Sequence, residues 1–232
     1  MLFSKKKIKE IILQNKELEW AHIYHDSIRG KEYLEKLPLN IGRWAGSYSF
    51  FYVLNRILSD YKPNSILDLG LGESSKFINA FMKNSLPSTT HVVVEQDQDW
   101  IDVFSKNTTL TDRSRIVHCP LEEITVKGHK SNSYKDFKKN VNQKFDLYIV
   151  DGPFGSERYS RYNIIELIKD FTPEDEFIIL FDDCERQGES DTVNDIFEAL
   201  KKKNITVFSN KYIGNKTQYV IATQKYKFAT SF

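Results

Sequence analysis

Three aspartates follow two apolar runs of the sequence and could do chemistry together. Asp151 comes after FDLYIV, and Asp182 and Asp183 come after EFIILF. If these runs are neighbouring parallel strands, their carboxyl ends meet at one edge of a sheet, where such sheets bind ligands. Carboxylates crowded in a partly buried cleft repel one another, and a divalent cation such as Mg²⁺ or Mn²⁺ would offset that repulsion. The three residues are therefore candidate metal ligands.

Nearby arginines offer a second interpretation of these aspartates. The carboxylates could cap helices or form ion pairs with Arg158, Arg161 or Arg186. Arg158 and Arg161, in SERYSRYN, could instead form a fork toward a carboxylate or phosphate on an anionic substrate. They could equally lie at a solvated helix start, paired with Glu157 or Glu166. These alternatives stay open.

A glycine-containing turn precedes these runs and is suited to an adenosine cofactor. The apolar run SILDL contains Asp68, and Gly70 and Gly72 follow in the order DLGLG. Glycines let the backbone approach a ligand without a Cβ in the way. Ser75 stands where a nicotinamide fingerprint has its third glycine or alanine, and the lack of a GK[ST] sequence excludes a P-loop. Glu95, at the end of the run HVVVE, could accept hydrogen bonds from both ribose hydroxyls.

The pattern of the chain predicts the scaffold that positions these residues. Residues 1 to about 60 are expected to be helical on either side of the loop LPLNIGRWAGSYS. From Ser65 onward, seven apolar runs alternate with helix-like stretches at 74–84, 97–106, 158–170 and 190–203.

The composition of the runs predicts how the strands are arranged. The first five are almost continuous in Val, Ile and Leu, as in parallel strands covered on both faces, whereas the last two are too close for a crossover helix. We therefore expect an α/β fold, with a Rossmann-like, doubly wound, seven-stranded sheet that is mostly parallel and has an antiparallel last strand. An N-terminal helical extension (1–60) would precede this domain (61–232), and the polar stretch 127–144 is expected to be a surface insertion.

The composition of the chain argues against a nucleic-acid-binding, a secreted or a membrane-spanning protein. A formal net charge of +1 gives no electrostatic basis for nucleic-acid binding. The sequence shows no apolar signal region and no transmembrane segment, so a cytoplasmic protein is expected. Cys119 and Cys184 lack metal or redox spacing and are predicted to be free, buried thiols in a reducing compartment.

These motifs resemble the class I S-adenosylmethionine-dependent methyltransferases over about residues 62 to 224. DLGLG fits their [D/E]-x-G-x-G pattern, and Asp68 ahead of the glycines favours S-adenosylmethionine over NAD. The strand after Glu95, RIVHCPLEE, would bring Cys119 to Leu121 to the adenine. The resemblance implies cofactor contacts from Asp68, Gly70, Gly72, Glu73, Ser74, Glu95, Gln96, Cys119, Leu121 and Asp151.

A finer resemblance concerns the methyl acceptor. DDCERQG has the length of the D-N-x-L-x-x-G segment of catechol and caffeoyl-CoA O-methyltransferases, with Asp183 at the asparagine position. Macrocin-type sugar O-methyltransferases have Asp-Asp there. Glucuronoxylan 4-O-methyltransferases are similar at GLGESS, EQDQDWI and VDGPFG. The resemblance implies metal-assisted methylation of a hydroxyl on a sugar or polysaccharide precursor, with Asp151 or Asp183 taking the proton.

Two other functions remain open. DGPF resembles the [DNS]-P-P-[YFW] motif of amino-methyltransferases but lacks its first proline. A non-catalytic module that binds S-adenosylmethionine is the other alternative.

Residues 1–60 would cover the acceptor site or form a homodimer interface. Trp100 and Ile101 are expected to pack their helix.

Overall fold

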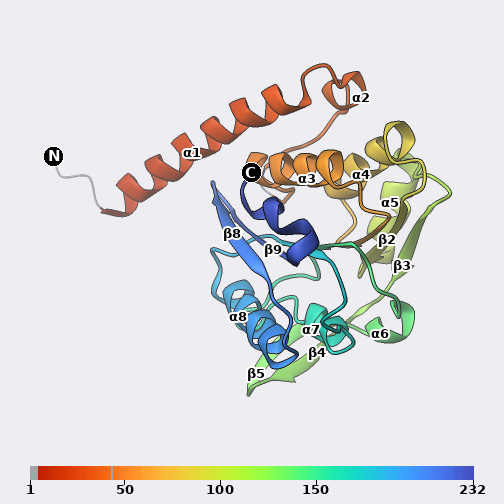
Figure 1. Ribbon diagram of the computed structural model, residues 1–232, viewed down its shortest axis with the longest axis vertical. Coiled ribbons are helices and arrows are strands. Elements are labelled where there is room, and N and C mark those ends of the chain that lie inside the picture. The colour runs from red at the N-terminus through yellow and green to blue at the C-terminus, as the bar shows by residue number, and fades with distance from the viewer. Residues whose placement is uncertain (1–4, 43) are drawn as a thin grey trace.

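The computed structural model describes residues 5–42 and 44–232, which fold around a central sheet (Figure 1). The helices of this part of the chain are α1 (Lys5–Ile28), α2 (Glu32–Glu35), α3 (Tyr48–Asp60), α4 (Glu73–Asn84), α5 (Gln98–Asn107), α6 (Phe137–Asn140), α7 (Asn163–Ile168), α8 (Gln187–Lys202) and the 3₁₀ helix η1 (Gln224–Thr230). The strands are β1 (Ser65–Leu69), β2 (Thr90–Glu95), β3 (Ser114–His118), β4 (Leu121–Val126), β5 (His129–Tyr134), β6 (Leu147–Val150), β7 (Ile178–Phe181), β8 (Phe208–Ile213) and β9 (Thr217–Ala222).

The described residues form the predicted seven-stranded sheet, in the order β3-β2-β1-β6-β7-β9-β8. Strands β3, β2, β1, β6 and β7 are parallel to one another, and β9 is antiparallel to both β7 and β8. The strand order reverses at β1, which pairs with β2 on one side and β6 on the other. The carboxyl ends of β1, β2 and β6 therefore meet at a switch point, where open α/β sheets bind ligands.

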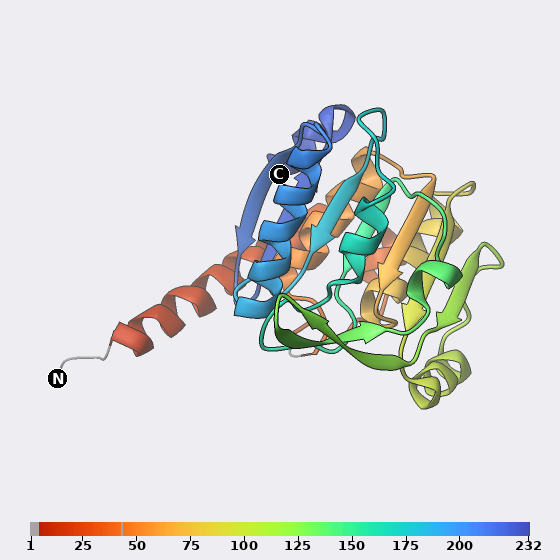
Figure 2. The same cartoon turned by 90° about the horizontal axis from the view of Figure 1, so that it is seen from below.

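Both faces of the sheet are covered by helices, so the doubly wound prediction is confirmed (Figure 2). Ile66 and Ile149 face one way, toward α3 and α4, and Val93, in register with Ile149 across β1, packs against α5 on the same face. Leu67 and Val150 face the other way, toward α6, α7 and α8. Because strand side chains alternate, an almost continuous apolar run is what a sheet buried on both faces requires.

The stretch 127–144 differs from the surface insertion that its polar composition predicts. Strand β5 pairs with β4 in an antiparallel hairpin, and Tyr134 and Phe137 are buried. Ser131 and Ser133 on β5 are also buried, and the Ser131 hydroxyl donates to the Tyr159 carbonyl at 2.7 Å. Hydrogen bonds of its serines, together with the single buried side chain of Tyr134, hold this strand in place, so the hydrophobic pattern does not reveal it.

Helix α7 is shorter than the predicted helix at 158–170. Tyr159 and Arg161 have φ values of 49° and 58°, in the left-handed region, so the segment before Asn163 forms a turn. The final strand pair also begins later than ITVFS suggests, because β8 starts at Phe208.

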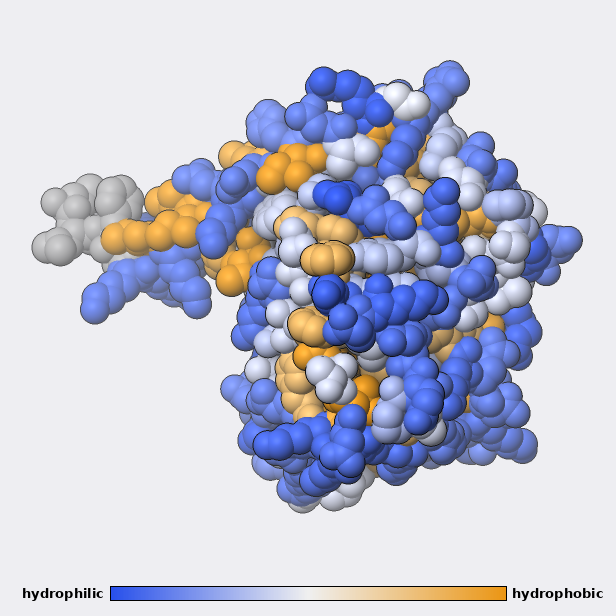
Figure 3. All heavy atoms as spheres, viewed as in Figure 1, coloured by the Kyte–Doolittle hydropathy of each residue, from blue (hydrophilic) through white to orange (hydrophobic). Residues whose placement is uncertain are grey.

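Helix α1 extends away from the body of the protein (Figure 1). Its second half is attached, because Trp20 Nε1 donates to the Ile213 carbonyl at 2.9 Å and Glu17 accepts from the Tyr48 amide at 2.7 Å. Its first half exposes Ile8 and other apolar side chains, visible as the orange surface along the helix in Figure 3. Helix α3, by contrast, is buried in the core that it shares with the sheet. The domain boundary at residue 60 stays a prediction.

Two further expectations can be compared with the structure. Cys119 and Cys184 are both buried and free, as predicted. Among the described residues, no helix combines the length and apolar composition needed to cross a membrane.

Candidate functional site

The glycine turn after β1 is held rigidly by residues from two neighbouring segments. Gly70 has a φ of 111°, which an L side chain rarely adopts, and its amide donates to the Val94 carbonyl at 2.9 Å. The next residue, Leu71, is held at both of its backbone polar groups. Its amide donates to Glu95 Oε2 at 2.9 Å, and its carbonyl accepts from Trp100 Nε1 at 2.7 Å. Trp100 was expected only to pack its helix, and its bond to the turn is an added role.

Glu95 is placed at the predicted strand end, but it already binds the protein backbone. Its Oε1 accepts from the Gln96 and Asp97 amides at 2.8 and 3.0 Å, in addition to the Leu71 bond at Oε2. The side chain is buried, and this burial raises the pKa of Glu95 against the opposing effect of the backbone amides. Its first task is therefore to fix the turn, and ribose binding by Glu95 stays a prediction.

Asp68 supports the same turn from below. It is completely buried, and its carboxylate accepts from the Ser75 hydroxyl at 2.7 Å and from the Ser74 hydroxyl at 3.0 Å. Both serines lie in the first turn of α4, so Asp68 ties that helix start to the end of β1. Asp68 is completely buried in this ligand-free structure, and a contact between Asp68 and the cofactor stays a prediction. Glu73, beside it, pairs with Lys76 at 2.6 Å.

A cavity of about 350 Å³ lies at the carboxyl ends of β2, β3 and β6. Gln96 and Leu121, both predicted cofactor residues, line it together with Phe154 and the segment 97–99. Its volume is at the lower end of the range for small-molecule sites, which begins near 300 Å³. Cys119 was predicted to face the adenine, but it is completely buried, and its thiol accepts from Asn140 Nδ2 at 3.6 Å. A contact between Cys119 and the adenine stays a prediction.

The three predicted aspartates do come together at this edge. One oxygen from each of Asp151, Asp182 and Asp183 lies within 4.8 Å of the other two. Their exposure differs sharply: the side chains of Asp182 and Asp183 are 0% and 3% exposed, and that of Asp151 is 21% exposed. Gly70 connects the cluster to the glycine turn, since a Cβ at Gly70 would lie 3.5 Å from the Asp151 carbonyl carbon.

Two protein cations lie between these carboxylates. Arg161 Nη2 is 2.6 Å from Asp183 Oδ2 and 3.1 Å from Asp151 Oδ1. Lys216 Nζ is 3.1 Å from Asp183 Oδ1 and 3.5 Å from Asp182 Oδ2. Each nitrogen occupies the place between two carboxylates that a bridging ion would take. The arrangement therefore does not fit a divalent metal, and the ion-pair alternative describes the cluster better.

Further partners complete the cluster. Gln218 Nε2 donates to Asp182 Oδ1 at 2.7 Å, and Arg186 Nη1 lies 3.2 Å from Asp183 Oδ2. Lys216 and Gln218 were missed from the sequence. A signal for them existed, because an antiparallel last strand must begin at the edge where β7 ends, and Phe181 is in register with Tyr219.

The charges in the cluster shift the pKa values in opposite directions. Burial opposes ionisation of Asp183, but Arg161, Lys216 and Arg186 outweigh it and lower the pKa of that carboxyl. At Asp151, burial dominates and Asp182 adds to it against Arg161, which raises the pKa to about 8. The pKa of Lys216 is raised, because the three aspartates outweigh the burial that disfavours its ammonium form.

Arg158 and Arg161, the predicted fork toward an anionic substrate, each pair with carboxylates of the chain. Arg158 makes a two-point ion pair with Asp191 on α8. Arg161 is buried, and its Nη1 donates to the Asp182 carbonyl at 3.1 Å. The two guanidinium groups bind different carboxylates, and their action on a substrate stays a prediction.

Gly152 distinguishes the site from the amino-methyltransferase motif. A Cβ at this position would overlap Tyr134 Oη and lie 3.1 Å from Gly70 Cα. A proline ring, which the [DNS]-P-P-[YFW] motif has at this place, needs more room than a single Cβ. The packing of Tyr134 against Gly152 therefore disfavours that alternative.

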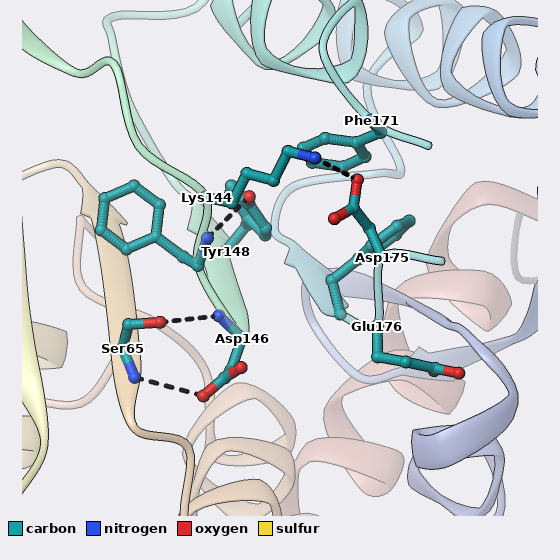
Figure 4. Close-up of a pocket in the computed structure, with 9 residues that line it drawn as sticks. Ser65, Lys144, Asp146, Tyr148, Phe171, Asp175 and Glu176 are labelled. Carbon is teal, nitrogen blue, oxygen red and sulfur yellow. Dashed lines mark hydrogen bonds and ion pairs between the residues drawn. The ribbon is translucent and has the colours of Figure 1, made fainter. Parts of the chain in front are cut away.

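A second cavity, of about 160 Å³, lies at the opposite edge of the sheet, where β1, β6 and β7 begin (Figure 4). Its polar groups bind one another: Asp146 accepts from the Ser65 amide at 3.3 Å, and Lys144 pairs with Asp175 at 2.6 Å. None of the predicted site residues lines it. We regard it as part of the scaffold.

The chain matches no protein-family model and no curated protein sequence. Among solved structures, it resembles the O-methyltransferase TomG from Streptomyces achromogenes, involved in tomaymycin synthesis and solved with S-adenosylmethionine, at a TM-score of 0.55 and 10% identity over 96% of this chain and 99% of that one. It also resembles the O-methyltransferase from Bacillus cereus, solved with S-adenosylhomocysteine, at a TM-score of 0.53 and 13% identity over 90% of each chain. With the sheet order above, these similarities establish that the chain has the Rossmann-like fold of class I methyltransferases.

Proposed function

We propose that this protein is an S-adenosylmethionine-dependent O-methyltransferase. The observation that carries the proposal is the placement of a preformed glycine turn between a cavity and a carboxylate cluster at one switch point. The cavity offers Gln96, Leu121 and Phe154 to an adenine, and Asp151 lies beyond the turn, next to Gly70. In this fold, such a crevice is where a nucleoside cofactor binds.

The chain contributes a proton acceptor and a fixed frame to the reaction. S-adenosylmethionine supplies an activated methyl group, so the protein must orient the acceptor oxygen in line with it and help remove its proton. Asp151 is the most exposed member of the cluster, and its pKa of about 8 makes its ionised form, which predominates only above that pH, a stronger base than an ordinary aspartate. Asp182 and Asp183 are too buried to meet an acceptor, and they hold Arg161 and Lys216 beside Asp151.

For the acceptor, we propose a hydroxyl on a sugar or polysaccharide precursor. Two resemblances support this proposal. Asp182 and Asp183 stand where macrocin-type sugar O-methyltransferases have Asp-Asp, and VDGPFG is similar to a motif of the glucuronoxylan 4-O-methyltransferases. Arg186, half-exposed at the rim of the cluster, could contribute to an anionic acceptor.

Calorimetric titration with S-adenosylmethionine and S-adenosylhomocysteine tests cofactor binding. Gly70→Ala should weaken binding by at least about tenfold, because its φ of 111° strains any L residue. Gly30→Ala is the matched control: Gly30 also has a positive φ, of 79°, but lies in the turn after α1 with nothing within 4 Å of its Cβ position. Equal binding by wild type and Gly70→Ala would contradict the cofactor assignment.

Transfer is tested with methyl-labelled cofactor and a panel of glycans and nucleotide-linked sugars. Label on a sugar hydroxyl supports the full proposal. Label on an amine would favour the amino-methyltransferase alternative, and tight cofactor binding without transfer to any acceptor would favour a non-catalytic module.

A further inference from the structure

The cation that balances the aspartate cluster is part of the chain. We propose that Arg161 and Lys216 act as resident cations in place of a divalent metal, so that this protein needs no metal ion, and that Lys216 is the positioning residue of the Asp182–Asp183 pair. The part that concerns methyl transfer rests on the proposed function. The part that concerns metal binding does not, and it can be tested without cofactor or acceptor.

Arg161 is held in place by more contacts than an exchangeable cation would have. Its side chain is 4% exposed, and its Nη1 donates to the Asp182 carbonyl at 3.1 Å and to the Val150 carbonyl at 3.3 Å. Its Nε lies 3.8 Å from Glu189, which is also buried. Moving the guanidinium aside for a metal would leave the Val150 and Asp182 carbonyls and the Asp183 carboxylate without this donor.

Lys216 is positioned by the backbone of the β8–β9 turn. The Lys216 carbonyl accepts from the Gly214 amide at 2.9 Å, and the next residue, Thr217, accepts from the Cys184 amide at 2.8 Å. The second bond attaches the turn to the segment directly after Asp183. The Lys216 side chain is 12% exposed, so its ammonium group is confined to the cluster.

The depth of the carboxylates supports the same conclusion. A metal shared by all three would have to sit beside Asp182 and Asp183, which are almost completely buried. Asp182 has Lys216 at one oxygen and Gln218 at the other. Asp183 has Arg161 at one oxygen and Lys216 at the other. Of the three, Asp151 alone is appreciably exposed, at 21%, and a single exposed carboxylate is a weak metal site.

The first experiment titrates the wild-type protein with Mn²⁺ and with Mg²⁺ in a calorimeter. We expect no saturable binding up to about 1 mM of either ion, and a thermal midpoint that 1 mM Mn²⁺ shifts by less than about 1 °C. Stoichiometric Mn²⁺ binding that Asp183→Asn abolishes would overturn the proposal. So would methyl transfer that EDTA abolishes and Mn²⁺ restores. A failure of cofactor binding would instead refute the proposed function and leave the metal result standing.

The second experiment replaces Lys216. Lys216→Met keeps the aliphatic stem but removes the charge, Lys216→Arg keeps the charge, and exposed Lys202→Ala on α8 is the control for losing a lysine. We expect Lys216→Met to lower kcat by at least about tenfold with little change in the KM for S-adenosylmethionine, and Lys216→Arg to recover most of that loss. Lys202→Ala should behave as wild type. An unchanged kcat in a folded Lys216→Met variant, or a loss that Lys216→Arg does not recover, would overturn the assignment of Lys216.

Discussion

Glu95→Gln tests whether the Glu95 carboxylate stabilises the glycine turn in the absence of any ligand. Glu95 accepts three backbone hydrogen bonds, at 2.8 and 3.0 Å to Oε1 and at 2.9 Å to Oε2. A glutamine that keeps its carbonyl oxygen at the Oε1 position retains the first two bonds. Its NH₂ group then faces the Leu71 N–H, so a donor meets a donor and the bond that fixes the turn is lost.

The size of the effect follows from two opposing contributions. A hydrogen bond to a charged group contributes about 1.5–3 kcal/mol to stability. Burial raises the pKa of Glu95, which means that the buried charge has a cost, and the neutral glutamine avoids it. We expect a net loss of about 1–2 kcal/mol, which lowers Tm by roughly 2–8 °C for a chain of this length.

The assay is thermal unfolding of the cofactor-free protein, followed by calorimetric titration with S-adenosylhomocysteine. Glu95→Gln should lower both the Tm of the free protein and the affinity, because the Leu71 peptide is no longer held. Glu122→Gln, exposed on β4, is the control. If affinity falls at least about tenfold while the Tm of the free protein is unchanged, Glu95 acts only on ribose and the reasoning is refuted.

Two further predictions concern Asp151 and Gly152. Because the pKa of Asp151 is about 8 in the folded protein and near 3.8 when unfolded, the folded protein keeps a proton that the unfolded chain releases between these values. The free energy of unfolding should therefore fall as pH rises from about 5 to 9. In urea titrations, Asp151→Asn should reduce that fall by on the order of 2 kcal/mol. Identical pH profiles for the wild type and the variant would contradict the raised pKa of Asp151. Gly152→Ala should lower the free energy of unfolding by about 1–3 kcal/mol, because the new Cβ overlaps Tyr134 Oη. Adding Tyr134→Phe, which removes that oxygen, should restore part of the loss. Strict additivity of the two substitutions in a double-mutant cycle would exclude the overlap as the cause.

The sequence was most informative where one local pattern decides the structure. The nearly continuous apolar runs predicted the doubly wound sheet, because strands covered on both faces have no polar side to show. The same runs placed Asp151 and Asp182 at adjacent strand ends, which the register of β6 and β7 confirms. Strand β5 was missed because HKSNSY has only Tyr134 as an apolar residue, and its burial depends on serine hydrogen bonds to a distant loop.

The partners of the aspartates were harder to predict, because ion pairing depends on packing between distant segments. Three arginines near the aspartates in sequence were equally good candidates, yet Arg158 pairs with Asp191 while Arg161 enters the cluster. The left-handed φ of Arg161 helps to make this difference, and no composition rule predicts that conformation for an arginine. Lys216 comes from a turn 65 positions beyond Asp151, and only the antiparallel pairing of β9 brings it to the site.

The acidic residues of the cofactor motif show why a motif can identify a fold without identifying contacts. Asp68 binds the hydroxyls of Ser74 and Ser75, and Glu95 binds the amide of Leu71, so both carboxylates are used by the chain itself. A turn held in this way loses little conformational freedom when a ligand arrives, and a ligand that meets a preorganised site binds more tightly. Cofactor affinity should therefore depend on Asp68 even though Asp68 is fully buried, and that dependence would act through the rigidity of the turn rather than through contact.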